Sequence, residues 1–102
     1  MNIDFSDALK KMNGVDNFID DATDETLTIG RFCAAVLSNI PPTGKNGADR
    51  ARAGNLAMRV YNGGQHELSV ADLAMIASAV RDYPAQTFLI AQTLSVIDPG
   101  GK

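Results

Sequence analysis

The feature that most constrains the fold is one helix whose two ends are both marked, between Pro41-Pro42 and Gly63-Gly64. Proline cannot extend a preceding helix, because it lacks an amide hydrogen and its ring clashes with the previous turn. Asn46 stands at the N-cap position, and glycine ends helices because it adopts left-handed backbone angles at little cost. Apolar residues between these signals recur at the spacing of one helical face: Ala53, Leu56, Ala57, Val60 and Tyr61. The pattern predicts an amphipathic helix that packs on a core.

Three further helices are predicted. One begins near Thr28 and carries a wide apolar stripe as far as Ile40. Another follows the capping pair formed by Ser69 and Asp72, and its inward residues are Leu73, Ile76, Ala77 and Val80. The last covers residues 85–97, with Pro84 at its first position, and is apolar nearly all round. Such a helix is either the central core element or buries a second face in a partner subunit.

The first 28 residues are less regular. Residues 3–12 favour a short helix capped by Ser6 or Asp4, and Asn13-Gly14 is a turn signal. A small hairpin that pairs residues 15–19 with 26–28 is left open. The sequence therefore predicts an all-α fold, a small helical bundle of four to five short helices, with a minor N-terminal β-hairpin as an option. We expect one domain over residues 1–102: an acidic segment (1–25), a helical core (26–98) and a frayed tail (99–102).

Charge is unevenly distributed along the chain. The net charge is −3, but residues 1–25 carry −5 and residues 26–65 carry +4. The plain explanation is that the two regions face each other, within the fold or across an oligomer. Arg50, Arg52 and Arg59 on one helix also resemble a phosphate-contacting face. Nucleic acid is disfavoured as a partner, because counterion release favours clustered positive charge and the chain as a whole is acidic.

Residue types for catalysis or metal binding are sparse. The only cysteine, Cys33, lies on an apolar stripe and is predicted to be a small buried hydrophobe, and His66 is predicted to be a surface residue in a turn. When a calcium loop is counted from Asp16 or from Asp20 in the acidic run, the glycine and the final glutamate that the loop requires are both missing. We therefore expect no enzyme activity, no cofactor and no metal. We expect the protein in the cytoplasm, because it has a single cysteine, no apolar run of membrane-spanning length and no signal-peptide layout.

One anion-binding surface is predicted around the start of the central helix. Gly44-Lys45 is not a phosphate loop, because Asn39 and Asn46 stand where that motif needs glycine and Ser or Thr. Basic side chains nevertheless gather where a helix N-terminus favours an anion. The candidate ligand-binding residues are Lys45, Arg50, Arg52 and Arg59. The alternative is an ordinary capped helix with solvated cations.

The order of five segments resembles a group of small phage and prophage-encoded helical proteins of unassigned function. The segments are IDFSDALKKMNG, ETLTIGRFCAAVLSNI, DRARAGNLAMRVYNGG, HELSVADLAMIASAV and AQTFLIAQTLSVID. The Pro41-Pro42 turn and the nearly uninterrupted last helix depart from that layout. The resemblance implies a phage context and carries over no activity and no catalytic residue.

These observations lead to one functional expectation. We expect a non-enzymatic phage accessory protein in the host-cell cytoplasm, which inhibits a host or defence process by binding. It would occlude a bacterial host protein or sequester a small anionic, nucleotide-like ligand, and would form a homo-oligomer through its C-terminal helix. The alternatives are a phage structural or assembly protein and a DNA-binding regulator.

Overall fold

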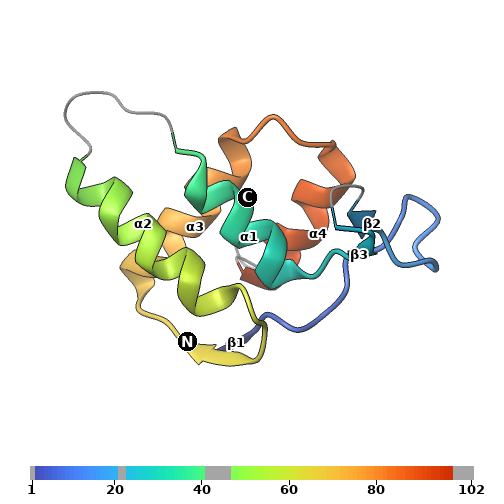
Figure 1. Ribbon diagram of the computed structural model, residues 1–102, viewed down its shortest axis with the longest axis horizontal. Coiled ribbons are helices and arrows are strands. Elements are labelled where there is room, and N and C mark those ends of the chain that lie inside the picture. Colours follow the sequence, from blue (N-terminus) through green and yellow to red (C-terminus); the bar gives the residue numbers. More distant parts are fainter. Residues whose placement is uncertain (1, 21–22, 41–46, 98–102) are drawn as a thin grey trace.

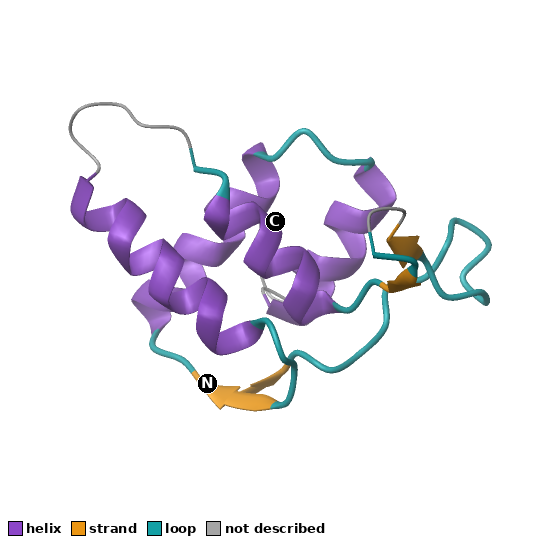
Figure 2. Ribbon diagram, in the orientation of Figure 1, coloured by secondary structure: helices purple, strands orange, loops and turns teal. Residues whose placement is uncertain are grey.

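The computed structural model describes residues 2–20, 23–40 and 47–97, and this part of the chain forms four helices and four short strands (Figures 1 and 2). In chain order these are β1 (Asn2–Asp4), β2 (Ile19–Asp20), β3 (Glu25–Thr26), α1 (Ile29–Ser38), α2 (Gly47–Val60), β4 (Gln65–Glu67), α3 (Val70–Asp82) and α4 (Thr87–Ile97). The Pro41-Pro42 turn, the Asn46 cap and the tail at 99–102, all predicted from the sequence, lie outside the described residues.

The fold is helix-dominated but mixed, so the all-α prediction holds only in part. β1 pairs antiparallel with β4, and Ile3 lies opposite His66. The short helix expected over residues 3–12 does not form. The Asp4 carboxylate accepts the Ser6 N–H at 2.8 Å, a local bond that competes with helix. The Phe5 N–H donates to the Gly64 carbonyl at 2.9 Å, so the backbone of this segment is bonded across the molecule instead of along itself.

A hairpin is present near the predicted place, but it is shorter than residues 15–19 with 26–28. β2 pairs with β3, Ile19 opposite Thr26 and Asp20 opposite Glu25. Asp24, just before β3, has a φ of 58°, in the left-handed region that aspartate tolerates better than most residues. In Figure 1 the hairpin lies at the opposite end of the molecule from the start of α2.

The predicted cap of α3 at Ser69 is confirmed, and α1 begins beside Thr28 as predicted, with Thr28 as its N-cap; the cap predicted at Ser6 or Asp4 is wrong, because no helix forms there. The Thr28 hydroxyl accepts the Arg31 N–H at 3.2 Å at the start of α1, and the Ser69 hydroxyl accepts the Asp72 N–H at 3.1 Å at the start of α3. The predicted start of the last helix at Pro84 is wrong, because α4 begins at Thr87. Tyr83 is extended ahead of the proline, as expected for the residue before proline, and the chain turns once more before it becomes helical.

The core is built mainly around α1, which packs against α2 and α3, while α4 packs against α3. α1 buries most of its predicted stripe, and Cys33 is completely buried. Tyr61 differs from the prediction: it is 45% exposed, and its ring lies 5.5 Å from the guanidinium of Arg31. The centre of the core also takes side chains from outside the helices, namely Ile3, Phe5, Leu9 and Leu68.

α4 contributes one face to this core and is not its central element. Leu89, Thr93 and Ile97 are buried, and the remaining apolar side chains of the helix are only partly covered. Gln92 fixes α4 to the N-terminal segment: its side-chain amide donates to the Lys10 carbonyl and accepts the Lys10 N–H, both at 2.8 Å. The side chain thus pairs with one residue of backbone in the way a strand would.

Candidate binding face on α2

α2 has a buried face and an exposed face of unusual composition. The buried side chains are those of Ala53, Leu56, Ala57 and Val60, four of the five predicted. On the opposite side, residues at helical spacing form what we call the outer stripe: Ala51, Gly54, Asn55 and Met58. Met58 is 72% exposed. A Cβ added at Gly54 would meet no atom within 4 Å, so another surface could approach the backbone closely there.

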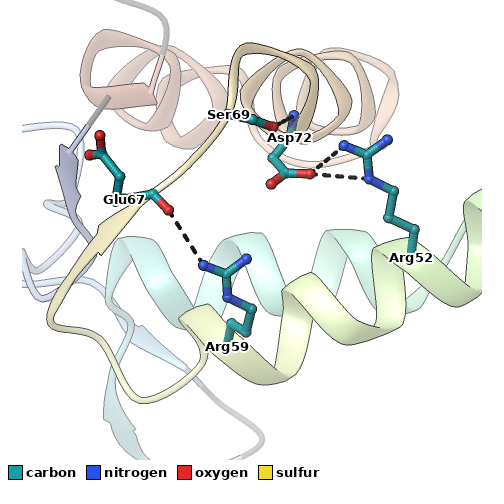
Figure 3. A network of polar contacts seen from close by, with 5 residues as sticks. All are labelled: Arg52, Arg59, Glu67, Ser69 and Asp72. Carbon is teal, nitrogen blue, oxygen red and sulfur yellow. Dashed lines mark hydrogen bonds and ion pairs between the residues drawn. The ribbon is translucent and has the colours of Figure 1, made fainter.

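Arg52 lies along one edge of the outer stripe, where it reaches α3. Its Nε donates to Oδ1 of Asp72 at 3.1 Å, and its Nη2 forms an ion pair with the same oxygen (Figure 3). The hydrogen bond from Arg52 lowers the pKa of Asp72 below its ordinary value, and the Ser69 hydrogen bond acts in the same direction. Asp72 therefore donates its backbone N–H to the Ser69 cap of α3 and holds Arg52 through its carboxylate.

The other two arginines of α2 are also held within the chain. Arg59, two turns after Arg52, points the same way and donates from Nη2 to the Glu67 carbonyl at 3.4 Å (Figure 3). Arg50 reaches in a different direction, toward the end of α1, and donates from Nε to the Ile40 carbonyl at 3.3 Å. Arg52 and Arg59 thus share one edge of α2, and Arg50 lies on the α1 side.

This placement bears on the predicted anion site. Of its four residues, Lys45 lies outside the described residues, Arg52 and Arg59 lie on the same edge of α2 but bind different acceptors, and Arg50 points elsewhere. The set stays a prediction. The sequence analysis missed Met58 as a surface feature, although an apolar residue among the polar side chains of Arg52, Asn55 and Arg59 was a usable signal. An ion pair between Arg31 and Glu25 joins the basic region (26–65) to the acidic region (1–25).

The remaining chemically versatile side chains lie elsewhere. Cys33 is a buried hydrophobe as predicted, and burial raises the pKa of its thiol to about 12, so the thiolate is not populated at neutral pH. The prediction for His66 is wrong: it is part of β4 and half-buried, 5.8 Å from the Phe5 ring between centroids, with Nε2 3.0 Å from the Gly63 carbonyl oxygen. Within residues 2–20, 23–40 and 47–97, no three potential metal ligands cluster.

None of the helices in the described residues has the length and apolar character needed to cross a membrane. Comparisons with protein-family models, with curated proteins and with solved structures return no match to this chain.

Proposed function

We propose that this chain is a non-enzymatic binding protein that engages another protein through the outer stripe of α2 and its arginine edge. The observation that carries the proposal is the set of side chains exposed there. Met58, Arg52 and Arg59 are of the types enriched at protein interfaces, and in α2 no lysine and only one acidic residue, Asp49, accompany them.

The geometry supports the same proposal. A partner backbone can approach closely at Gly54, beside the small residue Ala51, with Met58 as an adaptable apolar contact. Arg52 and Arg59 are each oriented by an acceptor of this chain, so less side-chain entropy is lost when they bind. Because each arginine has five N–H donors, both keep donors for carboxylates or carbonyls of the partner.

The biological setting of the proposal follows the resemblance to small phage and prophage-encoded proteins. In that setting the partner is a bacterial host protein in the cytoplasm, and occlusion of its functional surface inhibits a host or defence process. The proposal includes self-association through α4, because the core covers four of its apolar side chains only in part: Phe88, Ile90, Leu94 and Val96.

The test uses paired Met→Glu variants of the full chain as baits in bacterial lysate, with quantitative mass spectrometry of captured proteins. Met58→Glu places a carboxylate in the outer stripe. Met12→Glu is the matched control, because Met12 is 79% exposed and lies in an N-terminal loop. We expect a captured protein that Met12→Glu retains and that Met58→Glu and Arg52→Ala/Arg59→Ala lose. With the purified partner, the loss should be about 30-fold or more in Kd if these are hot-spot residues.

Two results would count against the proposal, provided that circular dichroism shows the variants folded. One is a partner that survives Met58→Glu and the double arginine variant unchanged. The other is a small molecule released on denaturation in native mass spectrometry, with no protein captured, which would favour ligand sequestration instead.

A further inference from the structure

A second feature, separate from the outer stripe, is a pocket of about 630 Å³ where the end of α1, the start of α2 and the second half of α3 meet. Its volume lies within the range of small-molecule sites, which is roughly 300–1,000 Å³. Most of its wall is hydrocarbon, supplied by Val36 and Ile40 on one side and by Met75 and Pro84 on the other. An apolar body of several carbons would be desolvated in such a pocket.

The polar side chains of the described lining are three neutral ones, from Asn39, Ser78 and Tyr83, and two carboxylates. Asp49 of α2 and Asp82 of α3 both line the pocket, and the described lining residues include no lysine, arginine or histidine. No described residue donates a hydrogen bond or an ion pair to either carboxylate. Arg50, the nearest basic residue in sequence to Asp49, donates instead to the Ile40 carbonyl. Among the described lining residues, the two carboxylates are thus the only charged groups, and they favour a positively charged ligand.

We infer that this pocket binds a small amphipathic organic cation: a primary or secondary amine, protonated at neutral pH, on an apolar body of about six carbons. The ammonium donates to Asp49 and Asp82, and the hydrocarbon lies against Val36, Ile40 and Met75. Charge complementarity selects this class. A neutral molecule of the same shape gains only the apolar contacts, and an anion is repelled by both carboxylates.

The experiment is a methyl and amide NMR titration of the full chain with three probes of equal length: hexylammonium, hexanol and hexanoate. We expect hexylammonium to shift the methyl signals of Val36, Ile40 and Met75. It should bind about fivefold more tightly than hexanol, which corresponds to about 1 kcal/mol, or about half of that from each of two exposed carboxylates. Hexanoate should bind more weakly than hexanol. Raising the salt concentration should weaken the binding of hexylammonium and leave the binding of hexanol unchanged.

Variants separate this pocket from the general acidity of the chain. Asp49→Asn/Asp82→Asn should remove the advantage of hexylammonium over hexanol, whereas Asp7→Asn, an exposed aspartate outside the pocket, should preserve it. The inference is overturned if hexanol or hexanoate binds as tightly as hexylammonium, if the methyl signals do not move, or if Asp7→Asn weakens binding as much as the double variant. The salt dependence decides the matter with unmodified protein if the double variant does not fold.

Discussion

Replacing Gly30 by alanine tests the close approach of α1 to the end of α2. Gly30 is the second residue of α1, and a Cβ there would lie 2.2 Å from the carbonyl oxygen of Val60 and 3.0 Å from that of Phe5. Both neighbours are backbone, so neither can rotate away. The Phe5 oxygen accepts the Gly30 N–H at 3.0 Å, and the Val60 oxygen accepts the Gly63 N–H at 3.0 Å. Restoring ordinary contacts requires α1 and α2 to separate by about 1 Å.

The magnitude follows from this geometry. Overpacking a well-packed site costs roughly 1–3 kcal/mol, and the upper end applies because backbone must move. The gain in helix propensity offsets less than about 1 kcal/mol, since Gly30 lies in the first turn. We therefore expect Gly30→Ala to lose about 2–3 kcal/mol of unfolding free energy, a large part of the roughly 5–15 kcal/mol typical of a domain. Urea denaturation followed by circular dichroism measures this loss.

Gly54→Ala is the matched control, because the same substitution falls on a helix where a new Cβ meets nothing within 4 Å. There the propensity term acts alone, and we expect stabilisation of up to about 1 kcal/mol. Opposite signs at the two glycines are the signature of the α1–α2 crossing. The reasoning is refuted if Gly30→Ala unfolds within about 0.5 kcal/mol of the unmodified protein, or if both substitutions shift stability in the same direction.

Two further predictions concern polar contacts. Gln92→Ala should lower the free energy of unfolding in urea by about 2 kcal/mol, because both hydrogen bonds to Lys10 are lost. Gln86→Ala on the exposed surface should lower it by less than about 0.5 kcal/mol. Equal effects would contradict a structural role for the Gln92–Lys10 hydrogen bonds. In an NMR titration the pKa of Asp72 should lie below 3.8, the value for an unperturbed aspartate, and Arg52→Ala should raise it. Because the pKa of Asp72 is lower in the folded than in the unfolded chain, ionised Asp72 stabilises the fold. This contribution is present above the unfolded pKa and is lost as the pH falls through the folded pKa. An unperturbed pKa of Asp72 in the unmodified protein would contradict the contact with Arg52.

The parts of the fold that the sequence predicted well are those specified locally. The α1 stripe, the start of α1 near Thr28 and the Ser69 cap depend on residues within a few positions of each other, so periodicity and capping chemistry are sufficient. The start of α4 was predicted three residues too early, because proline is compatible both with a first helical turn and with the extended turn that Tyr83 begins.

The pairing of β1 with β4 could not be predicted in the same way. Each strand has only three residues, so neither carries an alternating pattern long enough to recognise. The paired residues, such as Ile3 and His66, are also far apart in the sequence, so no local signal joins them. What fixes the pairing is tertiary: Phe5 is completely buried, and Gly64 supplies the carbonyl for its N–H.

The candidate face was predictable in its residues but not in its geometry. Helical spacing placed Arg52 and Arg59 on the polar side of α2, yet Asp72 had been assigned only a capping role. Which side of α2 faces α3 is set by how both helices pack on α1, and a pattern within one helix does not contain that information. The separation of Arg50 from the other arginines follows from the same packing.

The N-terminal segment shows how acidity on the surface can coexist with a structural role inside. Its carboxylates account for the charge of −5 over residues 1–25, yet Phe5 and Leu9 are among the most completely buried side chains of the described chain. Its backbone is bonded to β4 by strand pairing, to Leu27 by the Leu9 N–H, and to α4 by Gln92. Because these contacts join elements that are remote in sequence, the segment closes the core although most of its described charged side chains are exposed.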